Sequence, residues 1–247
     1  MEDDFKTPRL YVDAPLAAGG VIDLTETQAH YLKNVMRRQL GTSVRLFNGR
    51  TGDWRAQIVD LSKKGVSVRV CDCLRPQNLS RALRLHVIFP PLKKEAQDFL
   101  IQKGTELNAA AFYPVLTDHA DVRHINTDRV KAQMIEAAEQ CERQDVPTCA
   151  PLAPLRDQVG ALTMPVFAAI ERLDTLAIAA GLTRAAGAAD VAVLIGPAGG
   201  WSAAEKDFLV KRPTVIPVSL GQTILRAETA AIAMISLFHL MPEKGRI

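Results

Sequence analysis

The sequence predicts an α/β protein in which a parallel sheet covered by helices follows a small β-barrel. The first observation is that residues 85–247 alternate short apolar runs with helical stretches, which is typical of a parallel sheet. The second is that residues 1–74 contain mostly short strand-like runs separated by Gly, Asn and Asp. With 247 residues and 48% hydrophobic composition, the chain has enough apolar material for two domains. We therefore expect a barrel over 1–74, a linker over 75–84 and an α/β domain over 85–247.

The N-terminal part is expected to be mostly strand, with one helix. A helix is predicted over 25–38, because Thr25 is a suitable N-cap and Leu32, Val35 and Met36 recur on one side at helical spacing. The expected strands are 9–12, 44–47, 54–59 and 65–70. Several short strands with a single helix indicate a small β-barrel.

The C-terminal part is expected to alternate strand and helix. The expected strands are 85–89, 112–116, 166–170, 191–195 and 214–218. The expected helices are 93–107, 128–143, 173–186, 203–211 and 228–240. Ser202 and Glu205 form a capping box before the fourth of these helices, and Pro242 ends the last one. Residues 145–165 contain four prolines and are expected to form an irregular connection.

The net charge of +3 is unevenly distributed along the chain. Residues 5–84 hold 14 Lys or Arg and 6 Asp or Glu, a net charge of +8, whereas residues 85–247 hold 16 and 18, a net charge of −2. A basic segment beside a near-neutral one indicates either a module that binds a polyanion such as nucleic acid or a solvated basic surface. Charge alone leaves both interpretations open.

Composition also argues against several other classes of protein. No run approaches the roughly 18 apolar residues of a membrane span, and the first residues, MEDDFK, lack the apolar region of a secretory signal. The four cysteines form no C-x-x-C pair and have no paired Cys/His spacing, which argues against a zinc site. Sparse cysteines fit a reducing compartment. We expect a cytoplasmic protein without a metal.

Two glycine-containing segments follow predicted strands where an α/β sheet binds its ligands. Residues 191–200 are an apolar strand that leads into Gly-Pro-Ala-Gly-Gly, and residues 215–229 are a strand, a glycine and a helix start. Taken singly, such glycines more often mark a turn than a binding site. Neither segment is G-x-G-x-x-G or G-x-x-x-x-G-K-[ST], which argues against a dehydrogenase and a P-loop nucleotide hydrolase. The chain also lacks the G-x-S-x-G elbow of α/β-hydrolases.

Together, however, these segments resemble the paired signature of a known family. Gly196-Pro-Ala-Gly-Gly200 followed by Leu220-Gly-Gln-Thr-Ile-Leu-Arg-Ala-Glu-Thr-Ala230 is similar to the ribosomal RNA small subunit methyltransferase E family, which belongs to the SPOUT methyltransferases. The resemblance covers most of the chain. It also includes Arg9, His30, Val35-Met-Arg37, Gln102-Lys-Gly-Thr-Glu-Leu107 and Glu139-Gln-Cys-Glu-Arg143.

The resemblance implies a fold and a reaction. It implies an N-terminal PUA-like barrel that binds RNA and a SPOUT domain with a C-terminal trefoil knot, which no sequence periodicity would indicate. It implies a homodimer that transfers a methyl group from S-adenosylmethionine to N3 of a uridine in the 16S rRNA of the small ribosomal subunit. Two positions depart from the family pattern. Ala198 stands where the family usually has Glu, and Asn108 stands where it usually has Gly.

The cofactor of this family needs a close-fitting pocket with many backbone donors and acceptors. The expected cofactor-binding residues are Leu194, Gly196, Gly200, Leu220, Gly221, Ile224, Leu225 and Thr229. For the leucines and Ile224 the alternative is a position in the core. Glu171, at the end of a predicted strand, either borders this pocket or is a solvated surface residue.

Methylation at N3 of uridine requires loss of a weakly acidic proton, so a base or a stabilising cation is needed. We expect Arg226 to stabilise the uridine anion and Glu228 to act as the acid/base partner. The alternative is that Arg226 and Glu228 form a structural ion pair at the helix start.

The RNA-binding candidates are basic residues of the N-terminal part, which would mostly contact phosphates. They are Arg9, Lys33, Arg37, Arg38, Arg50, Arg55 and Arg69, and Lys93, Lys94 and Arg123 could extend this track onto the catalytic domain. Each of them is also a candidate for an ordinary solvated surface charge. His119 and His124 lie near Asp118 and Asp121 in sequence, but no third ligand is placed for a metal.

Two rival hypotheses remain. One is a SPOUT methyltransferase that acts on another RNA position or base. The other is a catalytically silent RNA-binding paralogue that arose through loss of the glutamate at position 198. Cofactor binding tests the second hypothesis, and the chemical identity of the modified base tests the first.

Overall fold

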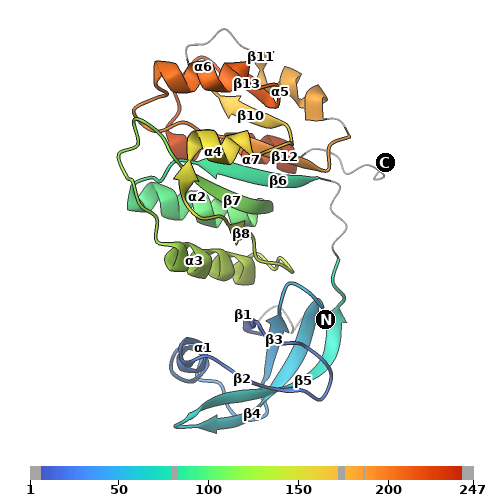
Figure 1. The fold of residues 1–247 in the computed structure, drawn as a ribbon. Coiled ribbons are helices and arrows are strands. Elements are labelled where there is room, and N and C mark those ends of the chain that lie inside the picture. The colour runs from blue at the N-terminus through green and yellow to red at the C-terminus, as the bar shows by residue number, and fades with distance from the viewer. Residues whose placement is uncertain (1–6, 79–82, 172–175, 186, 241–247) are drawn as a thin grey trace. The chain divides into compact units, whose positions relative to one another are not determined.

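The computed structural model describes residues 7–78, 83–171, 176–185 and 187–240. The chain divides into two compact units, one formed by residues 1–80 and 138–146 and the other by residues 81–137 and 147–247 (Figure 1). Part of the expected linker, 79–82, lies outside the described residues.

The first unit is a five-stranded sheet. Its strands, in spatial order, are β1 (Arg9–Tyr11), β3 (Ser43–Phe47), β4 (Asp53–Ser62), β5 (Gly65–Arg75) and β2 (Val21–Asp23). The pairings are antiparallel except for β1 with β3. Among the described residues no pairing of β1 with β2 closes the sheet into a barrel. Strand β2 was not expected, because it has three residues of which only Ile22 is buried.

The expected helix of the first unit is shorter than predicted and passes from an α-helix into a π-helical turn. Helix α1 (Glu26–His30) begins at the capping box formed by Thr25 and Gln28 and continues as a π-helical turn, η2 (Tyr31–Val35). The turn ends where Arg37 adopts a left-handed backbone with φ of 49°. The prediction of a helix to Arg38 is therefore wrong beyond Val35, because side-chain periodicity does not reveal a left-handed residue.

Buried charges hold residues 138–146 in the first unit. Asp53 has no solvent exposure and accepts hydrogen bonds from Arg9 (2.7 Å) and Arg75 (2.6 Å). Arg9 also donates to the carbonyls of Ala138 (2.8 Å) and Arg143 (2.7 Å). Buried charges are stable only when paired and hydrogen-bonded, so these contacts explain why a segment distant in sequence joins this unit.

The second unit contains a parallel sheet, as predicted. Its strands, in spatial order, are β11 (Leu176–Ala177), β13 (Val215–Ser219), β10 (Val166–Ala169), β12 (Asp190–Leu194), β6 (Arg84–Phe89), β7 (Ala109–Leu116) and β8 (Thr148–Cys149). A further strand, β9 (Ala153–Pro154), also pairs with β7. The inner strands are buried on both faces, which agrees with their continuous apolar sequences.

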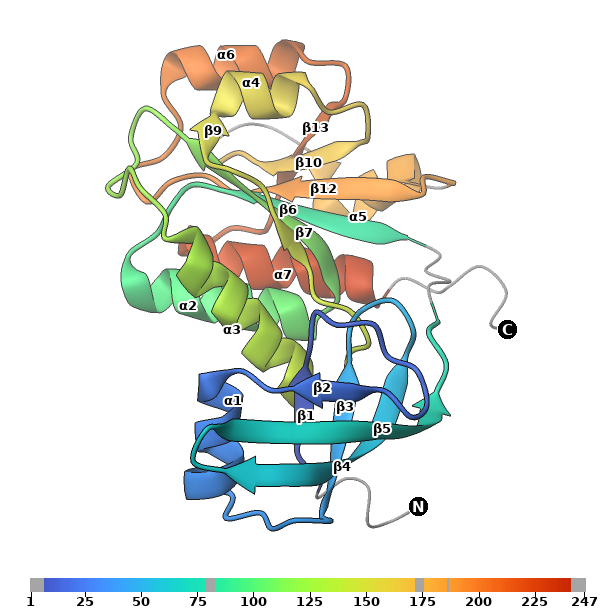
Figure 2. The ribbon, with the colours of Figure 1, turned by 60° about the horizontal axis from the view of Figure 1, so that its bottom comes forward.

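Helices cover both faces of this sheet. They are α2 (Lys94–Glu106), α3 (Thr127–Gln140), α4 (Leu155–Gly160), α5 (Ile178–Gly181), α6 (Ala203–Lys211) and α7 (Ala227–His239), with a 3₁₀ turn, η3 (Leu182–Ala185). Helices α4 and α6 lie on one face and α2 and α7 on the other (Figure 2). None of the helices in the described parts of the chain is long and apolar enough to span a bilayer.

Two regions differ from the predictions. Residues 145–165 contain β8, β9 and α4 instead of an irregular connection. The helix expected over 173–186 is replaced by β11, α5 and η3, and residues 172–175 and 186 lie outside the described residues. The two-residue strands β8, β9 and β11 exist because they pair with strands distant in sequence, and such pairing leaves no local periodicity.

Candidate active site

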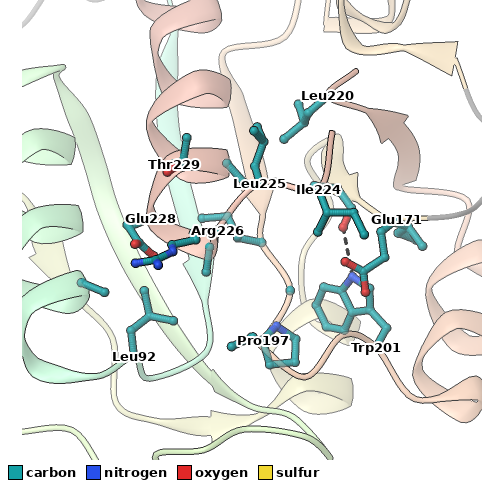
Figure 3. A pocket seen from close by; sticks show the side chains of 18 of the residues that line it. Leu92, Glu171, Pro197, Trp201, Leu220, Ile224, Leu225, Arg226, Glu228 and Thr229 are labelled. Atoms are coloured by element: carbon teal, nitrogen blue, oxygen red, sulfur yellow. Dashed lines mark hydrogen bonds between the residues drawn. The ribbon is translucent and has the colours of Figure 1, made fainter. Parts of the chain in front are cut away.

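A pocket of about 1250 Å³ lies at the carboxyl ends of β10, β12 and β13. These strand ends bring Ile170, Ile195 and Ser219 to the same edge of the sheet. Open α/β sheets bind their ligands at this edge, beyond the carboxyl ends of the strands. The two glycine-containing segments of the sequence form much of the pocket wall (Figure 3).

The first segment turns back tightly on a buried tryptophan. A Cβ atom on Gly196 would lie 2.9 Å from Nε1 of Trp201, so only glycine fits without displacing the indole. Nε1 of Trp201 donates a hydrogen bond to the carbonyl of Ala169 at the end of β10 (3.0 Å). The amide of Gly200 donates to the carbonyl of Pro197 (2.9 Å), which closes the turn. The indole of Trp201 therefore anchors the loop to the end of strand β10.

The turn that follows β7 supports this loop from another side. Oγ of Ser202 donates to Asp118 (2.5 Å), and the amide of Asp118 donates to Glu205 (2.8 Å), which is 4% exposed. His119 Nδ1 donates to the carbonyl of Gly200 (3.1 Å). These bonds link the turn to the capping box of α6, so the position of the loop depends on β7, β12 and α6 together.

Glu171 lies at the rim of the first loop. Gly200 has a left-handed backbone with φ of 73°, and a Cβ atom at this position would collide with the Glu171 carboxylate. Glu171 lines the pocket, and the described residues give its carboxylate no hydrogen-bond or ion-pair partner. Ala198 also lines the pocket. An acidic group is therefore present beside this loop although position 198 is alanine.

The second segment presents a helix start to the pocket. Gly221, with φ of 115°, allows the chain to turn after β13, and Arg226 is the N-cap of α7 without a side-chain cap bond. The first-turn residues Ala227, Glu228 and Thr229 line the pocket. Their amides have no partner within the helix, and the positive end of the helix dipole favours an anionic group here.

Arg226 and Glu228 both reach the pocket, but the structure records no ion pair between them. Figure 3 shows both side chains directed to the same side of the pocket as Leu92, whereas Glu171 and Trp201 lie on the other side. A structural ion pair at the helix start was the alternative interpretation of these two residues, and the described contacts do not support it.

Most of the expected cofactor residues line the pocket. They are Gly196, Leu220, Gly221, Ile224, Leu225 and Thr229. Ile224 is 66% exposed, which rules out a position in the core. Leu194 is fully buried on β12, and neither it nor Gly200 lines the pocket. Leu194 packs in the core because the sheet is covered on both faces, and Gly200 shapes the loop through its backbone.

Sequence reasoning missed one wall of the pocket. The first turns of α2 contribute Glu95, Ala96 and Phe99, and the segment just before the helix contributes Leu92. Their spacing of three and four residues would have predicted one helical face. No sequence signal, however, places that face against loops more than 90 residues away in the chain.

The structure gives Arg9 a structural position. Its side chain is 4% exposed, and its guanidinium binds Asp53 and two carbonyls and lies 3.7 Å from the ring centroid of Phe47. Burial lowers the pKa of Arg9, although the neighbouring Asp53 opposes this effect. A guanidinium enclosed in this way is not accessible to a phosphate. This position does not support the role in RNA binding that the sequence predicted for Arg9.

The other RNA-binding candidates lie nearer the surface of the first unit. Arg37 is exposed and Arg38 is half-buried. Arg50 pairs with Asp13 and Arg55 with Asp72, both at 2.9 Å between exposed side chains. Exposed pairs of this kind are weak and exchange readily for other anions. Lys33 donates to the carbonyl of Ser62.

Within the described residues no group of three or more His, Cys, Asp or Glu side chains could hold a metal ion. His119 is instead engaged by the carbonyl of Gly200.

Comparison with known proteins identifies the family. A family model described as an RNA methyltransferase domain matches residues 79–239, and one described as an RNA methyltransferase PUA domain matches residues 24–71. The ribosomal RNA small subunit methyltransferase E of Rickettsia conorii is 31% identical over 241 residues, 96% of each chain. This chain belongs to the ribosomal RNA small subunit methyltransferase E family. The resemblance inferred from the two glycine segments is thereby confirmed.

Other similar proteins support the assignment. The protein of that name from Synechocystis is 31% identical, covering 95% of this chain and 78% of its own length. The structure of the Neisseria gonorrhoeae methyltransferase E bound to S-adenosyl methionine has a TM-score of 0.83 and 25% identity over 97% of this chain and all of that one. A proposed methyltransferase of Legionella pneumophila, also with bound cofactor SAM, has a TM-score of 0.82 and 27% identity over 94% and 96% of the two chains.

Proposed function

We propose that this protein transfers the methyl group of S-adenosylmethionine to N3 of a uridine in the 16S rRNA of the small ribosomal subunit. The observation that carries the proposal is the pocket itself. Both glycine segments of the methyltransferase signature meet there, together with an exposed Arg226 at the start of α7. An arginine that no described residue neutralises, placed beside unpartnered helix amides, suits a reaction in which negative charge develops on the acceptor.

The residues present fit the cofactor. S-adenosylmethionine supplies a methyl group on a positively charged sulfur together with an amino acid and a nucleoside. The Glu171 carboxylate, which has no partner among the described residues, matches a cationic or hydroxyl donor of such a molecule, and the backbone of Gly196 and Gly221 can approach it closely. The residues that would hold it are Gly196, Leu220, Gly221, Ile224, Leu225 and Thr229.

The pocket residues then act on the acceptor base. Glu228 accepts the N3 proton of the uracil, and Arg226 with the first amides of α7 stabilises the negative charge that spreads over the ring. Bound S-adenosylmethionine would supply the methyl group to the N3 electron pair, and its sulfur would take up the electrons of the broken carbon–sulfur bond as a neutral thioether. Glu228 holds the N3 proton until it is released to water.

The first unit supports the RNA part of this proposal. Its exposed basic residues, foremost Arg37, Arg50 and Arg55, can bind phosphates and hold the rRNA in position without reading its sequence. A substrate of this kind places the reaction in the cytoplasm. Glu171 beside Gly200 argues against the silent-paralogue hypothesis, because the loop retains a carboxylate despite Ala198.

The test is direct product analysis. The purified protein is incubated with radiolabelled S-adenosylmethionine and small subunits that lack the modification, and the rRNA is digested to nucleosides. Label in 3-methyluridine is the expected result. Label in another nucleoside would establish a methyltransferase of different specificity. RNA binding without label would support the silent paralogue.

Two variants connect the result to the pocket. Arg226→Ala is expected to lower kcat by about 100-fold to 1000-fold, the usual cost of removing a group that stabilises charge in the transition state. Arg184→Ala removes an exposed arginine of η3 that does not line the pocket and serves as the matched control. Equal activity of the two variants would refute the role of Arg226.

A further inference from the structure

One face of α2 turns away from the core and into the pocket. The buried side of this helix carries Gln97, Leu100, Ile101 and Gly104. The residues of α2 that line the pocket, Glu95, Ala96 and Phe99, follow a second stripe at spacings of three and four, and Leu92 lines the pocket just before the helix. None of the residues assigned above to the cofactor or to proton transfer lies on this stripe. The pocket wall that the stripe forms, called the α2 wall below, is therefore without an assigned role.

The apolar part of this wall, which we call the slot, consists of Leu92, Ala96 and Phe99. Phe99 lines the pocket and is 45% exposed. Ala96 lies one helical turn before it, and Leu92 lies before the start of the helix at Lys94. A flat apolar ring that is exposed beside a small side chain gains free energy when another flat ring covers it.

The pocket has room for a second ligand beside the cofactor. Its volume of about 1250 Å³ exceeds the roughly 300–1000 Å³ of ordinary small-molecule sites. Figure 3 shows Arg226 and Glu228 on the side of Leu92, and Glu171, Ile224 and Trp201 on the opposite side. The cofactor-binding loops thus form one side, and the α2 wall with the two reactive side chains forms the other.

We propose that the α2 wall is the acceptor-base site, and that it takes a single pyrimidine base turned out of the RNA strand. The base stacks on Phe99 over Ala96, with its edge toward Arg226 and Glu228. Lys93, which is exposed and lines the pocket at the N-cap of α2, binds the phosphate of the same nucleotide. The inference rests on the proposed function, because it assigns the substrate side of the same pocket.

The geometry agrees with the demands of the reaction. N3 of uracil is engaged in pairing in a duplex, so an enzyme can reach it only in an unpaired or extruded nucleotide. Aromatic side chains hold such bases by stacking, which tolerates different sequences. The slot therefore supplies orientation, whereas Arg226 and Glu228 supply the chemistry.

Filling the slot tests the proposal without disturbing the core. Ala96→Leu adds bulk to a half-buried helix position where leucine is well tolerated. We expect an unchanged affinity for S-adenosylmethionine in calorimetry and a loss of about 100-fold in kcat/KM with small subunits. Ala132→Leu, the same change at an exposed position of α3 that does not line the pocket, is the control and should keep full activity.

The outcomes of this variant are distinct. Full activity of Ala96→Leu would overturn the proposal, because a base could not then occupy the slot. Loss of cofactor affinity would also overturn it, because the wall would then belong to the cofactor site.

A second pair of variants tests stacking at Phe99. Phe99→Ala is expected to raise KM for the RNA substrate by about 30-fold, whereas Phe99→Trp should restore it because the stacking surface returns. Phe99→Leu keeps the apolar volume without a flat ring and should behave like Phe99→Ala. Equal KM values for the leucine and tryptophan variants would contradict stacking.

Photocrosslinking separates this proposal from the proposed function. An RNA carrying 5-iodouridine at the acceptor position is irradiated with the protein, and the attached peptide is located by mass spectrometry. Attachment to Phe99 is expected, and attachment only outside α2 would overturn the proposal. Attachment to Phe99 without methyl transfer would leave the base site standing and refute the catalytic function instead.

Discussion

At the scale of single residues, left-handed backbone positions shape the pocket and its supporting elements. Gly200 and Gly221 allow the two pocket loops to turn, and Asn108 has φ of 71° between α2 and β7. Asparagine tolerates this conformation better than other side chains, so replacement of the family's usual glycine at position 108 keeps the same turn. These positions could be expected from residue types alone, because the left-handed region restricts which residues can occupy it.

The substitution Gly200→Ala is predicted to weaken cofactor binding. The new Cβ would meet the Glu171 carboxylate in a left-handed backbone that already costs alanine about 1–2 kcal/mol. Calorimetry with S-adenosylmethionine should show a loss of about tenfold or more in affinity. Gly160→Ala in α4, where a Cβ meets no atom within 4 Å, is the control and should bind normally. An unaffected Gly200→Ala would show that the loop geometry is not required.

Position 108 offers a test of stability instead of binding. Asn108→Ala should lower the free energy of unfolding by about 1 kcal/mol, because alanine gains nothing from a left-handed backbone. Asn108→Gly should be neutral or stabilising at the same site. Chemical denaturation of both variants measures the difference, and an alanine variant as stable as the glycine variant would contradict this account.

At the scale of elements, the sequence predicted the helices and strands that local interactions define and missed those that long-range contacts define. The capping box of Ser202 and Glu205 fixed α6 at Ala203–Lys211, the predicted range, because its hydrogen bonds are local. The strands β8 and β9 were missed, because they are defined only by pairing with β7. The pair of β6 with β12 shows the same dependence, since Asp190 joins Arg84 and His86 from the neighbouring strand.

This strand-to-strand contact predicts a pH-dependent contribution to stability. Partial burial alone would raise the pKa of Asp190, but hydrogen bonds from Arg84 (2.6 Å) and His86 (2.7 Å) outweigh it and lower the pKa. The pKa of this aspartate is therefore lower in the folded state than its unfolded value of about 3.9. The ionised aspartate stabilises the folded protein at pH values above the unfolded pKa, and this stabilisation is lost as the pH falls through the folded pKa.

The substitution Asp190→Asn should therefore lower the free energy of unfolding at pH 7 by about 1–2 kcal/mol. The difference from the unmodified protein should shrink as the pH is reduced below about 4, where the aspartate is protonated too. Denaturant unfolding at a series of pH values measures both effects. A difference that stays constant into the acid range would contradict the assignment.

At the scale of the whole molecule, the basic segment found in the sequence is nearly balanced by acidic residues within its own structural unit. Residues 5–84 carry a net charge of +8, but the first unit, residues 1–80 and 138–146, holds 13 Lys or Arg and 12 Asp or Glu, a net charge of +1. Within it, Arg9, Arg45 and Arg75 are engaged by Asp53 and its neighbours. Other basic residues also have acidic partners, such as Arg50 with Asp13 and Arg55 with Asp72. Part of the positive charge that suggested nucleic-acid binding thus stabilises the fold, and sequence alone could not separate these two uses.

The family resemblance predicts a homodimer. Light scattering after size-exclusion chromatography should give about twice the chain mass of 26.9 kDa. A mass of one chain over the full range of protein concentrations would contradict this expectation. The trefoil knot that the resemblance implies could be tested independently by pulling the unfolded chain from both ends, since a knotted chain retains a shorter extended length.

The sequence by itself determined the parallel α/β class, the family and the two loops that form the pocket. Periodicity, capping and left-handed turns act over a few residues, so residue types reveal them directly. Only the tertiary structure decided that Arg9 is enclosed by Asp53 and that Leu194 lies in the core. It also decided that Phe99 on α2 faces loops more than 90 residues away. These outcomes depend on which distant groups meet, and burial and pairing between them leave no mark on the local order of residues.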